Sequence, residues 1–256
     1  MLSVILPTFN KERQIRKVLH HILNELDTFT PDFEIIIVND GSRDLTLDQI
    51  NHFIDHSRHR HKIKIVNYPL NVGKGFALSY GFTQSVGDIV IFMDADLDIH
   101  PRQIRLFVDT LELFHADMVI GSKRHPLSRV HYPSIRKFYS WGYQQLIRLL
   151  FHLNLSDTQV GLKVFRRPVL DRTIPRMVVK QWAYDLELFV IAQKLGFTNI
   201  VEAPIDLDQA RFSSAVNYKT VYNMFLDTLA IWYRKNIIHY YDRPLRRSLL
   251  PHPQAA

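Results

Sequence analysis

The sequence predicts an α/β fold, in which helices flank a mixed, mainly parallel sheet. Short apolar runs alternate with helical stretches through the first half of the chain, a pattern typical of βαβ crossovers and buried parallel strands. The chain has 256 residues, and 46% of them are hydrophobic. This length and composition suit one full-size domain with its own core.

The first half contains strand-like runs rich in aliphatic residues, with helical stretches between them. We expect strands at 3–9, 33–40, 62–68, 88–96 and 116–122. We expect helices at about 12–26, 46–57, 75–85 and 101–114. A turn from Asn71 to Gly75 opens the third helix, and Pro101 starts the fourth.

The second half has longer helical stretches. Residues 134–153 have a helix pattern rich in Trp, Tyr, Arg and Leu, and 182–195 predict another helix. The segment 157–167 lies between them and is assigned no element. Residues 199–207 are typical of a strand.

The C-terminal region combines an amphipathic stretch at 216–240 with a basic tail. We therefore expect one domain over 1–215, followed by a C-terminal amphipathic helix and basic tail over 216–256. No run in the chain approaches the roughly 20 apolar residues that cross a bilayer. The prediction is that this region contains no transmembrane helix.

The charge balance is basic, with a formal net charge of +7. Such a charge indicates either an anionic partner or general solubility, and charge alone leaves both open. Nucleic acid is disfavoured, because the basic residues cluster near candidate phosphate positions instead of alternating with aromatics along a groove.

The expected location follows from three absences in the sequence. The first residues carry no basic segment and no cleavage site of a signal peptide. The chain has no cysteine, which fits a reducing compartment. We therefore expect a cytoplasmic protein that rests peripherally on a membrane.

Polar residues follow several of the predicted strands, at the point where each strand ends. These residues are Asn10, Asp40, Asp94, Asp96 and Ser122. Ligands of parallel sheets gather at the carboxyl ends of the strands. The sequence therefore predicts a site at this edge.

The run MDADLD, residues 93–98, places carboxylates directly after an apolar strand. Bare ionised groups are costly in an apolar site, and clustered oxygen ligands suit Mg²⁺ or Mn²⁺ with substrate phosphates. Asp94 and Asp96 are the candidate ligands, and Asp98 is a third ligand or lies just outside. The alternative is a solvated acidic turn that caps the next helix.

Two glycine-containing turns are candidates for nucleotide contacts. Asp40 ends a strand before Gly41, where its carboxylate can accept hydrogen bonds from a base or ribose; the alternative is an Asp-Gly turn with a Ser42 helix cap. The turn NVGKGFA places Lys74 and backbone N–H groups before a helix, where they can meet a phosphate. The alternative is an ordinary strand-to-helix turn.

Basic side chains near segment ends are candidates for phosphate contacts, since guanidinium forks suit phosphate oxygens. Each taken singly is equally typical of a solvated surface. The residues are Lys123, Arg124, Arg129, Arg136 and Arg211.

Seven motifs in order resemble those of the family-2 inverting glycosyltransferases with the GT-A fold, over roughly residues 3–215. They are PTFNKE, VNDGS, NVGKGFA, MDADLDIHP, GSKR, DTQVGLKVF and WAYDLEL. Within that family the chain resembles the dolichyl- and polyprenyl-phosphate mannose and glucose synthases. The motifs DTQVGLKVF and WAYDLELF resemble the glucose synthases more.

The resemblance implies roles for the donor side of the site. Pro7, Asn10 and Glu12 would line the nucleotide pocket, with Asp40 on the base and Lys74 nearby. The metal and the donor diphosphate would lie at Asp94 and Asp96, with Asp98 where mannose synthases carry a glutamine. The implied cofactors are Mg²⁺ or Mn²⁺, and the implied donor is UDP- or GDP-linked.

The resemblance also implies roles around the acceptor. Either Lys123 or Arg124 would contact the acceptor phosphate, together with Arg136, while Arg211 would close over the diphosphate. The sugar would face Asp157 and Gln159. That side would be supported by Asp185 and Glu187.

The implied reaction is inverting transfer of a hexose from UDP-glucose or GDP-mannose to a polyprenyl or dolichyl phosphate. An anionic phosphate acceptor needs no strong base. The alternative is transfer to a saccharide or another hydroxyl, which needs a base such as Asp185 or Glu187.

Two segments are candidates for a membrane surface. Both 134–153 and 218–247 mix aromatics with arginines, as helices in a headgroup layer do. The alternatives are a core-packing helix for the first, and a dimer contact for the second. The implied partners are a polyprenyl phosphate lipid and either a second copy or a membrane protein.

Overall fold

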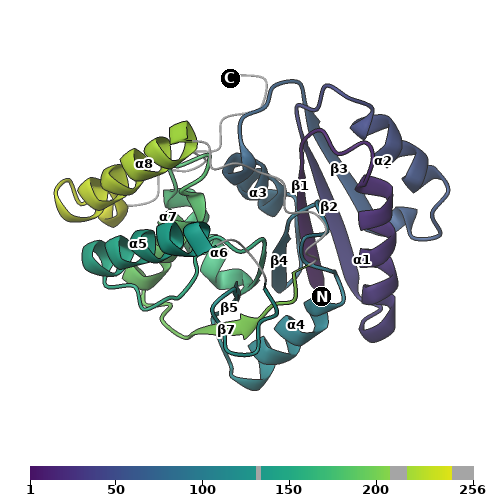
Figure 1. Ribbon diagram of the computed structural model, residues 1–256. Coiled ribbons are helices and arrows are strands. Elements are labelled where there is room, and N and C mark those ends of the chain that lie inside the picture. The colour runs from purple at the N-terminus through teal and green to yellow at the C-terminus, as the bar shows by residue number, and fades with distance from the viewer. Residues whose placement is uncertain (131–133, 208–217, 244–256) are drawn as a thin grey trace.

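The computed structural model describes residues 1–130, 134–207 and 218–243; in 134–140 and 218–220 it describes only the backbone. Its sheet has seven strands in the order β3-β2-β1-β4-β6-β5-β7 (Figure 1). The strands are β1 (Leu2–Thr8), β2 (Phe33–Asp40), β3 (Ile63–Tyr68), β4 (Ile89–Met93), β5 (Met118–Ser122), β6 (Leu162–Arg166) and β7 (Ile200–Pro204). All neighbouring pairs are parallel except those of β6, which runs antiparallel to both β4 and β5. The predicted mixed, mainly parallel sheet is confirmed.

Helices connect and cover the strands. They are α1 (Ile15–Phe29), α2 (Thr46–Asp55), α3 (Lys74–Thr83), α4 (Gln103–Leu113), α5 (Ser134–Phe151), α6 (Arg167–Thr173), α7 (Tyr184–Lys194) and α8 (Tyr218–Asn236). Short 3₁₀ turns add Arg60–Lys62, Ile174–Arg176 and Tyr240–Asp242. Each predicted helix and strand is present, with ends shifted by a few residues. In the described part of the chain, no helix is both long and apolar enough to span a membrane.

Two apolar cores lie on opposite faces of the sheet, because successive side chains of a strand point to opposite faces. In β1, Val4 and Leu6 pack with α1, α2 and α4 on one face. On the other face, Ile5 packs with α3, α6 and α7, and with buried residues of α5 and α8. This double cover explains why the strands read as continuous apolar runs.

The segment 157–167, which the sequence left unassigned, contains β6. This strand lies between β4 and β5 and pairs with both, for example through Phe92–Lys163 and Ile120–Lys163. Lys163 interrupts its short apolar pattern, and Gly161 directly precedes it, which hides the strand in the sequence.

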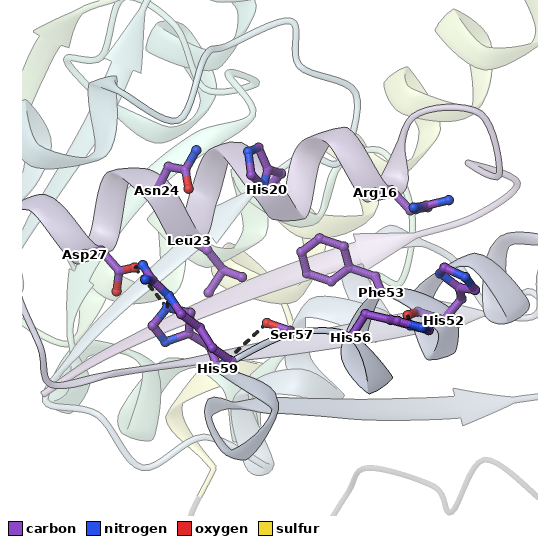
Figure 2. A pocket seen from close by; sticks show the side chains of 11 residues that line it. Arg16, His20, Leu23, Asn24, Asp27, His52, Phe53, His56, Ser57 and His59 are labelled. Carbon is purple, nitrogen blue, oxygen red and sulfur yellow. Dashed lines mark hydrogen bonds and ion pairs between the residues drawn. The ribbon is translucent and has the colours of Figure 1, made fainter.

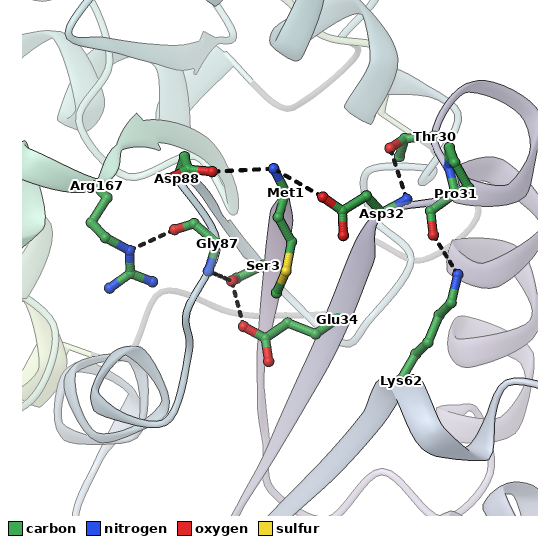
Figure 3. A network of polar contacts seen from close by, with 10 residues as sticks. All are labelled: Met1, Ser3, Thr30, Pro31, Asp32, Glu34, Lys62, Gly87, Asp88 and Arg167. Atoms are coloured by element: carbon green, nitrogen blue, oxygen red, sulfur yellow. Dashed lines mark hydrogen bonds and ion pairs between the residues drawn. The ribbon is translucent and has the colours of Figure 1, made fainter.

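The amino ends of β1, β2 and β4 are joined by a polar network around Glu34 (Figure 3). Ser3 Oγ donates to Glu34 Oε1 at 2.7 Å and accepts from Gly87 N at 2.8 Å. The backbone N–H of Val86 and the ammonium of Lys64 also donate to Glu34, at 2.6 and 2.7 Å. Glu34 is only 5% exposed, so these bonds satisfy a buried carboxylate.

The helix α8 packs on the rest of the molecule through a few defined contacts. Ile231 and Thr228 are fully buried, and Thr228 shares a hydrogen bond with Tyr143 of α5 at 3.0 Å. Arg234 pairs with Glu187 of α7 at 3.2 Å. The division at 215–216 stays a prediction, as does the structure of the tail, which lies outside the described residues.

Candidate active site

The acidic turn 94–98 lies at the carboxyl end of β4. Because β1, β2, β4 and β5 are mutually parallel through the sheet, their carboxyl ends meet at the same edge. Along the turn, half-buried Asp94, Asp96 and Asp98 alternate with buried Ala95 and Leu97. The carboxylates of the turn therefore lie on its less buried side, away from the core.

Local backbone geometry shapes this turn. Leu97 has φ 62, a left-handed conformation that is uncommon for a bulky residue. The bend lets the N–H of Asp98 donate to Asp96 Oδ1 at 3.0 Å. Burial, followed by the negative charge of Asp94, raises the pKa of Asp96 above its ordinary value. Two carboxylates thus share a confined space.

Lys74 lies against the first of these carboxylates. Its Nζ is 2.5 Å from Asp94 Oδ1, and Lys74 is the first residue of α3, directly after Gly73 with φ 117. Burial alone would lower the pKa of Lys74, but the charges of Asp94, Asp185 and Asp96 raise it. The ammonium therefore stays charged and offsets part of the acidic turn.

A second ion pair lies behind the first. Lys163 of β6 is 3% exposed, and its Nζ is 3.1 Å from Asp185 Oδ1, at the start of α7. The same ammonium donates to the carbonyl of Val160 at 2.5 Å. Burial lowers the pKa of Lys163, and Asp185 opposes that shift. The sequence reasoning missed Lys163; the only available signal was a lysine within an apolar run.

Asp94 is also held from its other side. Its backbone N–H donates to the carbonyl of Gly161 at 3.0 Å. A Cβ on Gly161 would lie 2.7 Å from Asp94 Cγ, closer than real contacts allow. Residue 161 therefore limits the space available to Asp94, and the sequence reasoning did not single it out.

The acidic turn fits a divalent cation whose coordination is completed by substrate and water. Among the described residues, no three acidic, His or Cys side chains gather as a ligand set. Mg²⁺ typically uses one or two carboxylates with substrate phosphates and waters, which Asp94 and Asp96 can supply. The metal role of Asp98 stays a prediction.

The predicted nucleotide-binding residues hold three loops together. Asn10 Oδ1 accepts from the N–H of Arg43 at 2.9 Å, and Glu12 Oε2 accepts from the N–H of Leu45 at 3.0 Å. Pro7 lies in β1 opposite Val38. Asp40 is 3% exposed and accepts bonds from the loop 71–73. Contacts of these four residues with a nucleotide stay predictions.

The bonds of Asp40 account for its buried carboxylate. Val72 N and Gly73 N donate to it at 2.8 and 3.0 Å, and Asn71 Nδ2 donates at 3.0 Å. The carboxylate thereby fixes the loop that leads to Lys74. Asp40 thus connects the end of β2 to the acidic turn through Lys74.

The predicted acceptor residues lie after β5 and before β6. Lys123 Nζ is 3.8 Å from Asp157 Oδ2, while Asp157 Oδ1 accepts from the N–H of Gln159 at 3.0 Å. The N–H of Arg124 donates to Ser122 Oγ at 3.2 Å. Gln159 is exposed, and its amide reaches Met224 Sδ of α8 at 3.0 Å.

Two predicted arginines cannot be placed in this site. Arg211 lies outside the described residues, and the side chain of Arg136 does so too, although its backbone belongs to α5. Their predicted contacts with phosphate stay predictions.

Glu187 is fully buried and bound on both oxygens. Oε2 accepts from Val178 N and Val179 N at 2.8 and 2.7 Å, and Oε1 accepts from Tyr241 at 2.6 Å and from Arg234. Burial raises the pKa of Glu187, while these hydrogen bonds and the charge of Arg234 act to lower it. A carboxylate with every partner inside the protein is structural and has no access to a substrate hydroxyl.

A separate surface cleft lies between α1 and α2 (Figure 2). Its lining includes Arg16, His20, His52, His56 and Phe53. None of the predicted site residues lines it, so it is not part of the candidate active site.

Most of the chain matches a family model. The model described as Glycosyl transferase family 2 matches residues 3–174. Two similar proteins are the dolichyl-phosphate beta-glucosyltransferases ALG5A and ALG5C of Trichomonas vaginalis. ALG5A is 32% identical over 81% of this chain and 66% of its own length. ALG5C is 28% identical over 92% of this chain and 72% of its own length. This chain thus spans slightly less than two thirds of ALG5A.

Solved structures show the same fold. The glucosyl-3-phosphoglycerate synthase of Mycobacterium tuberculosis, in complex with Mn²⁺ and UDP-glucose, aligns with a TM-score of 0.67 at 20% identity. The alignment covers 92% of this chain and 78% of that one. At this identity the likeness shows the fold, which is the GT-A arrangement of helices around a mixed sheet.

Proposed function

The chain belongs to glycosyl transferase family 2, and on this premise we propose that it transfers glucose from a nucleotide sugar to a polyprenyl phosphate, with inversion. One observation carries the proposal: the chain matches dolichyl-phosphate beta-glucosyltransferases over most of its length. The position of Asp94 and Asp96 at the carboxyl end of β4 supports it. Among the predicted donors, UDP-glucose is favoured over GDP-mannose because these relatives are named for a glucosyl group.

In the proposed reaction, a phosphate oxygen of the lipid forms a bond to the anomeric carbon of the sugar. The bond from that carbon to the nucleoside diphosphate breaks on the opposite face, and the diphosphate leaves with the electron pair. A phosphate monoester is already anionic at neutral pH, so no side chain has to remove a proton. The task of the protein is to bring two negative groups together.

The residues on the donor side provide positive charge and orientation. Lys74 carries an ammonium at the acidic turn, where it can meet diphosphate oxygens. Asp94 and Asp96 would hold Mg²⁺ or Mn²⁺, which when bound neutralises the charge that develops on the leaving diphosphate. The loops that Asn10, Glu12 and Asp40 fix would shape the space for the nucleotide.

The residues on the acceptor side are Lys123 and Arg124, after β5. We propose that the acceptor phosphate binds at this pair, while the predicted phosphate contacts of Arg136 and Arg211 stay predictions. Asp157 would face the sugar, because its ion pair with Lys123 links the predicted sugar and phosphate positions. The ion pair between Lys123 and Asp157 supports a role for Lys123, in addition to Arg124, on the acceptor side.

A lipid acceptor requires access to a membrane surface, and α8 supports this requirement. Its outward side exposes large apolar side chains by 38–61%: Val221, Tyr222, Phe225, Leu226, Leu229 and Tyr233. An apolar stripe of this kind beside basic residues is typical of helices that lie in a headgroup layer. We propose that this side of α8 rests on the cytoplasmic face of a membrane.

The transfer assay compares donors and acceptors directly. Purified protein with Mn²⁺ is given UDP-glucose or GDP-mannose, together with a short polyprenyl phosphate or a saccharide, and products are identified by mass spectrometry. We expect a glucosyl lipid phosphate from UDP-glucose. Transfer only to the saccharide would support the alternative hydroxyl acceptor, for which Asp185 is the remaining predicted base.

A further inference from the structure

One oxygen of Asp94 already holds a cationic group. Lys74 Nζ lies 2.5 Å from Asp94 Oδ1, while the opposite side of the carboxylate lies against Gly161. A divalent cation and an ammonium compete for such a carboxylate, because two cations within a few ångströms repel each other. Lys74 therefore opposes cation binding in the nucleotide-free protein.

The start of α7 offers a second acceptor, because it packs against the start of α3: a Cβ on Gly75 would clash with the ring of Tyr184. Asp185 is 8% exposed, and its charge raises the pKa of Lys74. Within the described residues, Asp185 Oδ1 accepts no hydrogen bond of good geometry, although Lys163 Nζ is 3.1 Å away. A buried acceptor with unused capacity is uncommon, and the long side chain of Lys74 is 41% exposed and therefore has room to change conformation.

Lys163 keeps this second acceptor in place. Its buried ammonium is bound to the carbonyl of Val160 and paired with Asp185. The result is a line of alternating charges from Asp94 through Lys74 and Asp185 to Lys163. Lys163 and Asp185 are buried, whereas the side chains of Lys74 and Asp94 are 41% and 30% exposed. Of the two exposed members, Lys74 has the longer and more flexible side chain, so it is the member that can move.

We propose that Lys74 is an internal counter-ion that keeps divalent cations off Asp94 until the donor diphosphate arrives, and that Asp185, positioned by Lys163, then receives it. The inference rests on the proposed function. Diphosphate oxygens add the negative charge that lets two cations share the site. Cation and nucleotide therefore bind as a linked pair, and neither binds well alone.

The test measures Mn²⁺ affinity by the electron paramagnetic resonance signal of free Mn²⁺, with and without UDP. Wild-type protein should bind Mn²⁺ weakly alone and much more tightly with UDP. Lys74→Met should bind Mn²⁺ about tenfold more tightly than wild type without UDP, because the competing charge is gone. Its UDP dependence should shrink accordingly. Lys74→Arg keeps the charge and should resemble wild type.

A matched control separates local competition from overall charge. Lys180→Met removes an equal charge from an exposed lysine near α3, and it should leave Mn²⁺ affinity unchanged. Suppose that the wild-type protein transfers sugar but that wild type and Lys74→Met bind Mn²⁺ equally well without UDP. This result would overturn the role of Lys74 and leave the proposed function intact. Absence of Mn²⁺ binding with UDP in both would contradict this inference and the metal-dependent function together.

A second variant tests the receiving residue. Asp185→Asn combined with Lys163→Met removes both charges of the buried pair, which avoids an unpaired buried ion. We expect several-fold weaker Mn²⁺ binding in the presence of UDP, with nucleotide-free affinity unchanged. Unchanged affinity in both conditions, in protein with a normal thermal transition, would remove Asp185 and Lys163 from the proposal.

Discussion

Gly161 and Asp94 occupy adjoining space so closely that a methyl group on Gly161 would lie 2.7 Å from Asp94 Cγ. The backbone of residue 161 also accepts a hydrogen bond from Asp94 N. The φ angle of Gly161 lies outside the left-handed region, so its backbone conformation does not require glycine. The requirement comes from the lack of space for a side chain. The position of the acidic turn thus depends on a residue of β6's leading loop.

Gly161→Ala should displace the Asp94 carboxylate and lower the rate of transfer. We expect a decrease in kcat/KM of about 100-fold, the scale of a misplacement near 1 Å. The control is Gly142→Ala, since a Cβ there would meet no atom within 4 Å. Steady-state assays with both variants, alongside thermal melts, test this; equal activities would show that Asp94 tolerates the shift.

Asp96→Asn should abolish most transfer, because the acidic turn loses one of its two proposed cation ligands. The expected loss is about 100-fold or more, and EDTA should have a comparable effect that added Mn²⁺ reverses. Asp55→Asn, at the exposed end of α2, serves as the control. Full activity of Asp96→Asn together with full activity in EDTA would rule out the metal-dependent mechanism.

Glu34→Gln should destabilise the fold at neutral pH. Burial alone would raise the pKa of Glu34, but bonds from Lys64, Val86 and Ser3 hold it below the ordinary 4.5. We expect a loss of about 1.5–3 kcal/mol in the free energy of unfolding, typical of hydrogen bonds to a buried charge. Urea titrations at neutral pH measure this difference.

The same pair of proteins should respond differently to acid. A depressed carboxyl pKa contributes stability above pH 4.5, and this contribution is lost as pH falls through the lower, folded-state pKa. The difference in the free energy of unfolding between wild type and Glu34→Gln should therefore become smaller below pH 4.5. A gap that stays constant down to pH 3 would contradict the ionised form of Glu34.

Glu187→Ala should destabilise the packing of α7 and α8, because Arg234 and Tyr241 lose their shared buried acceptor. We expect the free energy of unfolding to fall by about 3–5 kcal/mol, which is the cost of removing one partner of a buried ion pair. Glu187→Gln keeps an acceptor oxygen and should lose less. Denaturant unfolding of the two variants measures the difference; equal, small losses would place Glu187 outside the structural network.

Phe225→Glu with Leu226→Glu should reduce binding to vesicles of phosphatidylcholine and phosphatidylserine in a flotation assay. Both side chains are exposed on α8, by 42% and 45%, and burying carboxylates in a headgroup layer is unfavourable. Leu113→Glu, on α4 with 75% exposure, is the control. Activity on a water-soluble polyprenyl phosphate should persist, and equal flotation of all proteins would argue against α8 as the lipid-facing element.

The sequence predicted the central parallel strands β1 and β2 because both are apolar on both faces, and their burial shows why. Helices cover both faces of this pair, so Ile5 and Leu6 are equally buried. The strand β6 escaped prediction because Lys163 looks like a surface residue. The charge that neutralises it, Asp185, lies 22 positions further along the chain and on another element.

The acidic residues of the candidate site could be predicted from the sequence, but the interactions that hold them in position could not. Asp94 and Asp96 follow an apolar strand, which is a local signal. The partner of Asp94, Lys74, could be identified as a phosphate candidate but not as a counter-ion, because the ion pair depends on how α3 meets β4. The same limit applies to Asp40, whose carboxylate is used by the loop 71–73.

The position of β6 in the sequence also determines when the acidic turn can form during synthesis of the chain. Asp94 emerges from the ribosome long before residues 161–166, yet its backbone and carboxylate are held by Gly161. A nascent chain that ends before β6 has an open gap between β4 and β5, with exposed edges on both strands. Such a chain lacks the backbone acceptor that Gly161 supplies to Asp94, so the acidic turn reaches its final geometry only after β6 has been synthesised and inserted.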